Sequence, residues 1–236
     1  MNPMVASTLI QQQVGIEVMM HFSCRDRNLL AIQSDLLGAH ALGLRNILAI
    51  TGDPAQIGDY PVATSVFDVD SIGLVRVLRR FNDGLDMAGN TIKESTAFLI
   101  AVGFNPLAPD SAKEQDRLKA EVDEGAQLIY TQPIYEMHVL EFAAEACARL
   151  QTPMLVGILP LRSSRHAEFL HNEVPGISVP DAFRRKIAAM GEESAKLFGV
   201  EAAREFLRQA RVCTAGVHLM PPFGSARIAA EVLEAL

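Results

Sequence analysis

Short apolar runs alternate with longer amphipathic segments along this chain. The short runs are bounded by polar or turn-forming residues, as expected for strands that are covered on both faces. They occupy residues 18–22, 47–50, 98–102, 128–130, 154–159 and 217–220. The pattern therefore predicts six buried strands.

The segments between these runs repeat apolar residues at helical spacing. The main stripes cover residues 29–37, 74–81, 118–122 and 139–150. Residues 162–211 form a longer insertion that predicts two or three helices, broken at Pro175 and Pro180. Residues 226–236 predict a last helix and residues 2–13 a first one.

Helix starts have their own sequence signals. Asp26 is a plausible N-cap for the helix that follows it, and Asp70 or Ser71 caps the next. Ser111 and Glu114 have the spacing of a capping box, in which each side chain accepts a hydrogen bond from the other residue's backbone N–H.

Strands that alternate with helices predict parallel crossovers and an α/β fold. Two architectures compete, an open doubly wound sheet and a (β/α)8 barrel. No GxGxxG or GxxxxGK fingerprint opens a helix, which weakens the nucleotide-binding open sheet. In a barrel, functional residues follow the carboxyl ends of the strands.

Composition and charge exclude several classes of protein and of binding partner. The chain has 236 residues, is 49% hydrophobic and 21% charged, and carries a formal net charge of −7. Disorder and spanning helices are therefore not expected, nor is binding to nucleic acid or an anionic membrane. No basic stretch precedes an apolar run near residue 1, so a secretory signal is not expected. Cys24, Cys147 and Cys213 are far apart, so we expect reduced thiols and a cytoplasmic protein.

Polar residues follow several of the predicted strands, where they could line a pocket. His21, Asp53 and Gln132 are the main candidates. Each has a plainer interpretation: a buried histidine bonded to a neighbouring strand, a turn-capping aspartate, and a satisfied core amide. No metal-ligand spacing is present, so no metal site is expected, and no GxSxG elbow occurs.

Several motifs in register carry a family resemblance. They are HFSCRDRN (21–28), LLGAHALGLRNILAITGDP (36–54), VFDVDSIGL (66–74), NDG…AGN (82–90), GFNPLAPD (103–110), EGAQLIYTQPIYE (124–136) and GILPLRSSRHAEFLHNEVPGISVP (157–180). The chain resembles methylenetetrahydrofolate reductase over nearly its whole length. It is most similar to the branch in which such a domain accompanies a homocysteine methyltransferase domain. A single barrel domain is expected over residues 1–236.

The resemblance implies a (β/α)8 flavoprotein of one-carbon metabolism and methionine biosynthesis. It would bind FAD and use NADH or NADPH to reduce 5,10-methylenetetrahydrofolate to 5-methyltetrahydrofolate. Asp53 would be catalytic, lying beside both flavin and folate, and Gln132 would bind the substrate. The other residues implied to bind FAD are His21, Thr51, Gly52, Asn105, Ala108 and Arg117.

Three single residues depart from the family pattern, and one is Asn105, a neutral donor where some members have a histidine. Glu121 replaces a lysine that helps hold FAD, so Lys113, Arg117 or Lys119 would have to substitute, or flavin binding would be weakened. Ser225 stands where an arginine is expected after PPFG, which removes a possible contact to the folate tail.

The start of the chain also departs from the pattern. Six of the eight barrel strands are present, and no residue aligns with the family's general-acid glutamate. The missing strands would lie upstream of Met1, come from another chain or be lost in a degenerate remnant, and we expect a homo-oligomer or association with a chain that completes the barrel. A catalytically incomplete or partner-dependent subunit is the alternative function, and a pterin-binding transferase without flavin is a weaker one.

Overall fold

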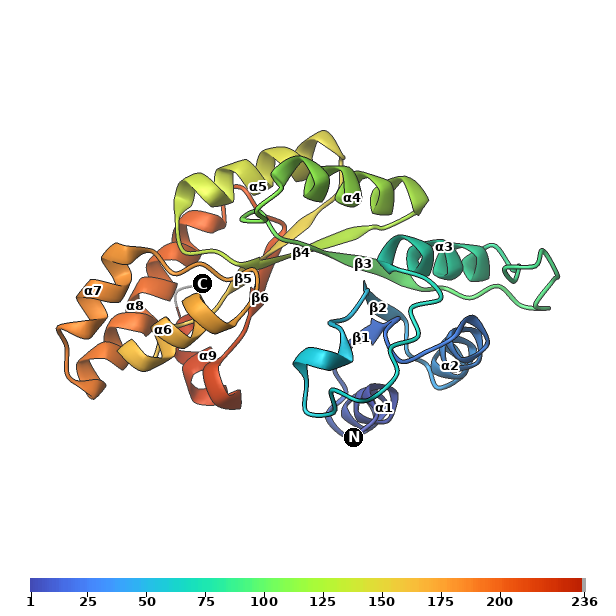
Figure 1. Ribbon diagram of the computed structural model, residues 1–236, viewed down its shortest axis with the longest axis horizontal. Helices are drawn as coiled ribbons and strands as arrows, with labels where there is room; N and C mark the ends of the chain where they lie inside the picture. The colour runs from blue at the N-terminus through green and yellow to red at the C-terminus, as the bar shows by residue number, and fades with distance from the viewer. Residues whose placement is uncertain (235–236) are drawn as a thin grey trace. The chain divides into compact units, whose positions relative to one another are not determined.

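The computed structural model describes residues 1–234 and has an α/β architecture (Figure 1). Each predicted apolar run forms a strand, with ends within a few residues of those expected. The strands are β1 (Met19–Ser23), β2 (Asn46–Ile50), β3 (Leu99–Phe104), β4 (Leu128–Pro133), β5 (Met154–Ile158) and β6 (Gly216–Leu219).

The strands follow one another in the sheet as they do in the chain, from β1 to β6. The pairs β1–β2, β2–β3, β4–β5 and β5–β6 are all parallel. A doubly wound sheet reverses its strand order at a switch point, and this sheet has no such reversal. The predicted α/β class and barrel-type topology are confirmed, with β1 and β6 as end strands of the described sheet.

The chain divides into two compact units. The first comprises residues 1–103 and 116–128, and the second comprises residues 104–115 and the chain from Ile129 onward. The first unit therefore holds β1 and β2 with nearly all of β3, and the second holds nearly all of β4 with β5 and β6.

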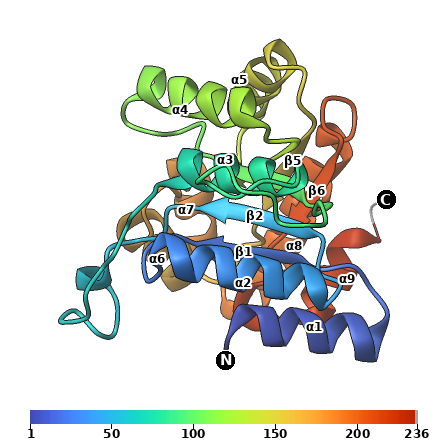
Figure 2. The same ribbon diagram turned by 90° about the vertical axis from the view of Figure 1, so that its right-hand side faces the viewer.

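Helices cover the strands of the first unit. They are α1 (Pro3–Val14), α2 (Leu29–Ala41), α3 (Ser71–Asn82) and most of α4 (Ser111–Glu124). Figure 2 shows α1 and α2 side by side, and a Cβ on Gly38 of α2 would lie 3.9 Å from Met4 Sδ of α1. Met20 and Phe22 of β1 are buried, whereas His21 between them is exposed, as the alternation of a strand requires.

The N-cap of α2 differs from the predicted one. Asn28, not Asp26, caps this helix, since its side chain accepts a hydrogen bond from Ala31 N at 2.9 Å. Asp26 is instead bonded to the Ser23 hydroxyl at 3.1 Å. At α3 the cap is Asp70, as one of the two alternatives predicted.

The predicted capping box at α4 does not form. The Asp110 carboxylate accepts from Lys113 N at 3.0 Å and caps the helix. The Glu114 carboxylate instead accepts a hydrogen bond from Asn105 N at 2.7 Å. The reason is positional: the helix begins at Ser111, so the cap residue is the one before it.

In the second unit, the insertion predicted over residues 162–211 forms three helices. Both prolines fall in the connection between α6 (Ser164–Glu173) and α7 (Asp181–Ala188), and Gly191 caps α8 (Glu192–Ala210). The other helices are α5 (Met137–Arg149) and α9 (Ala226–Leu233). Residues buried together in this unit are Leu161, Ala167, Leu170, Val179, Ile187 and Ala195.

Glycine permits the closest packing in this unit. A Cβ on Gly199 of α8 would lie 1.7 Å from Leu161 O, in the segment that follows β5. Only a residue without a side chain lets α8 approach that backbone.

Among the described residues, no helix combines the length and the apolar character needed to cross a membrane.

We expect Gly199→Ala to destabilise the protein by about 3 kcal/mol or more, because the added methyl group overlaps backbone that cannot rotate away. Gly38→Ala is the matched control. Its Cβ has room inside α2, so it should stabilise the helix by about 1 kcal/mol. Urea unfolding followed by circular dichroism measures both, and equal stability of the two variants would contradict the prediction.

Candidate functional site

In the first unit, the carboxyl ends of β1 and β2 lie together. Ser23 is in register with Ile50, and Cys24 N donates to Ile50 O at 3.2 Å. Gly52 follows β2 with φ +88°, and a Cβ there would lie 3.1 Å from Ser23 Cβ. Both the positive φ and this close approach require glycine. The Gly52 turn therefore brings the residues after β2 against the end of β1.

His21 and Asp53 are both exposed near these strand ends. Asp53 makes no hydrogen bond or ion pair with any residue in the described range 1–234, so its carboxylate does not cap the turn. His21 is not a buried core histidine. Protein around the ring still removes part of its hydration, which lowers the pKa of the imidazole and favours the neutral form at pH 7.

Thr51 holds the start of α3 at the same strand end. Its hydroxyl accepts a hydrogen bond from Ser71 N at 3.0 Å, and the Cys24 thiol donates to Asp70 O at 3.4 Å. Burial raises the pKa of the Cys24 thiol to about 12, so the group stays protonated. These contacts make Thr51 a positioning residue for the turn that carries Asp53.

Arg117 and Glu121 form an ion pair inside the first unit. Arg117 Nη1 lies 2.6 Å from Glu121 Oε1, and Nη2 donates to Gly103 O at 2.8 Å, near the end of β3. The Glu121 side chain is fully buried, while that of Arg117 is 31% exposed. Lys119 pairs with Asp123 on the exposed side of the helix. Arg117 is thus the cation held at this strand end.

In the second unit, a β-bulge presents Gln132. Tyr130 pairs with Leu155 and Pro133 with Gly157, so β4 has one residue more than β5 between the same pairs. A Cβ on Gly157 would lie 2.6 Å from Thr131 O, so the bulge needs glycine opposite it. Gln132 is exposed and is not a satisfied core amide. Bulges re-aim side chains in this way beside functional sites.

Asn105 and Gln132 share a neighbour in this unit. A Cβ on Gly176, whose φ is +82°, would lie 3.0 Å from Asn105 Nδ2 and 3.7 Å from Gln132 Cγ. Asn105 Oδ1 accepts from Leu107 N at 3.1 Å, and Asn105 O accepts from Ala108 N. The two amides therefore lie next to one glycine turn, with Ala108 one turn away.

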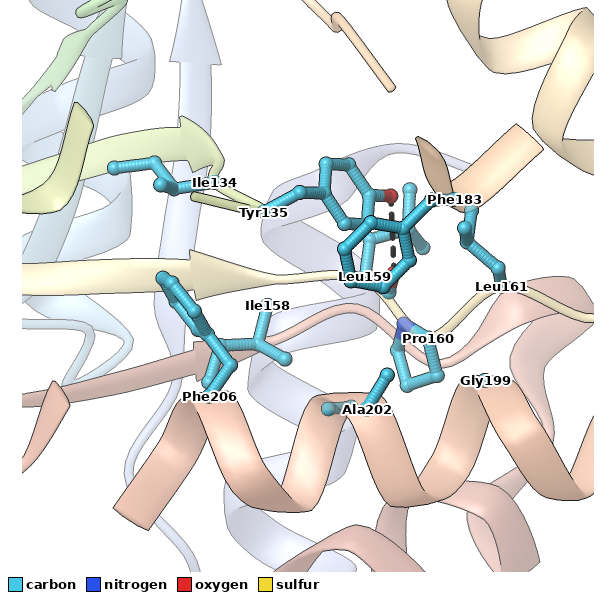
Figure 3. Close-up of a pocket in the computed structure, with 11 residues that line it drawn as sticks. Ile134, Tyr135, Ile158, Leu159, Pro160, Leu161, Phe183, Gly199, Ala202 and Phe206 are labelled. Carbon is cyan, nitrogen blue, oxygen red and sulfur yellow. Dashed lines mark hydrogen bonds between the residues drawn. The ribbon is translucent and has the colours of Figure 1, made fainter. Parts of the chain in front are cut away.

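A small apolar cavity also lies in the second unit (Figure 3). It measures about 30 Å³, and Ile134, Ile158 and Phe206 are among its lining residues. Tyr135 donates its hydroxyl hydrogen to Leu159 O at 3.0 Å, and burial raises the pKa of this phenol. The space suits a packing defect of the core and is too small for a cofactor.

The residues predicted from sequence fall into two groups. His21, Thr51, Gly52, Asp53 and Arg117 belong to the first unit. Asn105, Ala108 and Gln132 belong to the second. Ser225 caps α9 through a hydrogen bond from Ile228 N. Across residues 1–234, no group of His, Cys, Asp and Glu side chains could hold a metal ion, and all three cysteines are free thiols.

Sequence comparison matches residues 2–236 to a family model described as methylenetetrahydrofolate reductase. Methylenetetrahydrofolate reductase 1 of Schizosaccharomyces pombe is 28% identical over 214 residues, covering 85% of this chain and 32% of that protein. A probable NADH-type enzyme of Oryza sativa subsp. japonica is 26% identical over 209 residues, covering 85% of this chain and 34% of its own length. The chain thus spans about a third of these relatives.

A probable NADPH-type methylenetetrahydrofolate reductase of Caenorhabditis elegans is 26% identical over 173 residues, covering 68% of this chain and 24% of that protein. A solved structure with a similar fold has TM-score 0.58 and 11% identity, and the match covers 96% of this chain and 76% of that one. It is an uncharacterised protein from Clostridium thermocellum that binds two copies of 5-methyl-5,6,7,8-tetrahydrofolic acid.

We expect Arg117→Met to cost about 3 kcal/mol in the free energy of unfolding, because it leaves the buried Glu121 carboxylate without the guanidinium beside it. A second change, Glu121→Leu, should restore most of that loss by removing the buried charge. Chemical denaturation of the single and double variants measures this coupling.

The control for the Arg117 prediction is Arg79→Met. This residue pairs with Asp83 at 3.2 Å, but the two side chains are 58% and 51% exposed. Its loss should cost less than about 0.5 kcal/mol. Equal effects of the two single variants would show that burial of Glu121 does not matter.

Proposed function

This chain belongs to the methylenetetrahydrofolate reductase family, and we propose that it binds FAD and reduces 5,10-methylenetetrahydrofolate to 5-methyltetrahydrofolate with NADH or NADPH. The observation that carries the proposal is the Asp53 carboxylate. It is exposed, unpaired within residues 1–234, and projects from the glycine turn after β2, where the resemblance requires a catalytic aspartate.

The residues of the first unit fit a flavin dinucleotide. A diphosphate favours a cation with several N–H donors, and Arg117 provides a partly exposed guanidinium tethered to Gly103 O. The resemblance also implies that His21 and the Thr51–Gly52 backbone line the flavin ring, and burial lowers the pKa of the His21 imidazole, which favours its neutral form at pH 7. When bound, FAD would accept a hydride from the nicotinamide nucleotide and pass it to the folate.

Asp53 would act by charge. Opening the methylene bridge of the substrate leaves a positively charged iminium at N5, and a carboxylate nearby stabilises that cation while it accepts the hydride. The contribution requires an ionised Asp53 without a competing cation. In the described chain no arginine or lysine pairs with it.

Gln132 would orient the substrate. Its amide both donates and accepts hydrogen bonds, and the β4 bulge exposes it instead of burying it in the sheet. Asn105, beside the same glycine turn, would contribute a neutral amide toward the cofactor. We propose a cytoplasmic role in one-carbon metabolism, where these reactants are found.

A partner-dependent form of the same function is favoured by one observation. Within the described sheet β1 is an end strand with β2 as its neighbour, and end strands offer free backbone groups to another chain. The resemblance also assigns no residue of this chain to the family's general acid. Reductase activity that appears only when a second chain is added would support this form.

We expect Asp53→Asn to slow reduction of methylenetetrahydrofolate by about 10²–10³-fold, because it removes the charge that stabilises the cationic electrophile. Oxidation of NADH or NADPH with an artificial electron acceptor should be slowed less than folate reduction, since that half-reaction involves no iminium electrophile and its positive charge forms on the departing nicotinamide ring. Stopped-flow flavin absorbance, recorded after reconstitution with FAD, separates the two half-reactions.

Asp59→Asn is the control for the Asp53 variant. It removes an exposed carboxylate from the same loop and should leave both half-reactions unchanged. Equal folate reduction by the Asp53 variant and the wild type would refute the role of Asp53. A chain that neither takes up FAD nor oxidises either nucleotide would refute the proposed function.

A further inference from the structure

The bulge that exposes Gln132 interrupts the regular pairing of β4 with β5. Parallel pairing continued from Tyr130 and Leu155 would place Gln132 opposite Gly157. The register instead pairs Pro133 with Gly157, so β4 has one extra residue between the paired positions. The direction of the Gln132 side chain therefore depends on what holds this extra residue in place.

Proline removes a donor from the strand at this point. Pro133 has no backbone N–H, so β4 cannot donate a hydrogen bond to β5 there. The next donor, Ile134 N, lies beyond the bulge and donates to Gly157 O at 3.1 Å. The backbone thus fixes the far side of the bulge, while the near side has a different partner.

The Thr131 side chain supplies the partner on the near side. Gly157 N donates to Thr131 Oγ1 at 2.9 Å, and this hydrogen bond is buried. Thr131 is only 4% exposed, so water cannot readily replace its hydroxyl as the acceptor. In a regular parallel ladder a backbone carbonyl accepts from such an N–H, whereas here a side chain does.

The same bond brings two backbones into close contact. A Cβ on Gly157 would lie 2.6 Å from Thr131 O and 3.0 Å from the carbonyl carbon of Gln132. The Gly157 main chain is therefore packed against the peptide group that joins Thr131 to Gln132. The hydroxyl bond and this packing act on the same short segment, so together they fix the backbone from which the Gln132 side chain projects.

Thr152 shows a buried threonine with a different contact in the same unit. It is 8% exposed, and its hydroxyl donates to Leu150 O at 3.1 Å, two residues back along the chain. That bond closes a local turn before β5 and involves no irregular strand pair. The Thr131 hydroxyl instead joins two strands, between residues 26 positions apart, at the bulge itself.

We propose that Thr131 is a positioning residue for the reduction of methylenetetrahydrofolate, and that its hydroxyl sets the direction of the Gln132 amide toward the substrate. The inference rests on the proposed function, in which Gln132 binds the substrate. An amide orients a ligand only when its donor and acceptor atoms have fixed positions. Without the hydroxyl, the buried Gly157 N–H would have no acceptor, which favours a return to regular pairing and turns the Gln132 side chain.

Substitutions at Thr131 separate the hydroxyl from the rest of the side chain. Thr131→Val removes the acceptor and keeps the branched shape, while Thr131→Ser keeps the acceptor. Thr131→Ala differs from Thr131→Ser by one oxygen atom and serves if Thr131→Val fails to fold. Hydrogen exchange of the Gly157 N–H, followed by nuclear magnetic resonance, should be about tenfold faster in Thr131→Val and Thr131→Ala and unchanged in Thr131→Ser.

Folate binding tests the positioning role. In the chain reconstituted with FAD, Thr131→Val should raise the KM for methylenetetrahydrofolate about tenfold, and Thr131→Ser should restore it to near the wild-type value. Isothermal titration with 5-methyltetrahydrofolate should show the same ratio of Kd values without turnover. Adding Thr131→Val to Gln132→Ala should change the Kd no further, because the amide that Thr131 positions is then absent.

Thr152→Val is the matched control, since it removes a buried hydroxyl from the same unit and should change neither KM nor Kd. A Thr131→Val protein that exchanges the Gly157 N–H faster but binds folate like the wild type would overturn the positioning role. So would an equal loss of affinity with and without Gln132, which marks a general structural effect. Unchanged exchange at Gly157 would overturn the role of the hydroxyl.

The wild-type chain separates this proposal from the proposed function. Wild-type folate reduction together with unaffected Thr131 variants refutes the positioning role alone. A wild-type chain that binds no folate refutes the proposed function and the positioning role together.

Discussion

Parallel pairing of strands that are consecutive in the chain is the constraint on which the candidate sites depend. When neighbouring strands run parallel, the residues that follow them emerge at the same edge. In the first unit this places the turn of Gly52 against the end of β1, so Asp53 emerges beside residues that follow β1. In the second unit it places the bulge of β4 beside Gly157 of β5. Apolar side chains cover the faces of the strands, so the candidate functional residues lie after the strand ends.

The fold was predictable because burial on both faces leaves a strong mark on sequence. A parallel strand covered by helices becomes a continuous apolar run, and all six runs form strands. Local details such as helix caps were less predictable. Asp26 and Asn28 are both good N-caps, and the choice depends on where the helix begins, which is at Leu29. The Ser23 hydroxyl occupies Asp26, a contact that no pattern along the chain indicates.

The candidate sites were predictable in part, and mainly through resemblance. The residues that follow each strand could be predicted from the sequence. Whether their side chains are exposed could not be predicted, because exposure depends on packing between segments distant in sequence. His21 and Gln132 could equally have been buried. The bulge that exposes Gln132 depends on Gly157, 25 residues later in the chain, and the cavity lined by Phe169 and Phe223 joins α6 to a turn beyond β6. Neither has a local signature.

Glu121 shows how a replacement that looks unfavourable becomes acceptable in three dimensions. A carboxylate where the family resemblance implies a lysine would repel a diphosphate if it were exposed, but this side chain is fully buried and bonded to Arg117. Arg117 also donates to Gly103 O, which holds the guanidinium at the end of β3. The acidic residue therefore orients a cation instead of opposing one. Arginine has several N–H donors in a fixed plane, so the Arg117 guanidinium binds the Glu121 carboxylate and the Gly103 carbonyl at once. A lysine at position 121 would offer no carboxylate to hold Arg117 in this way.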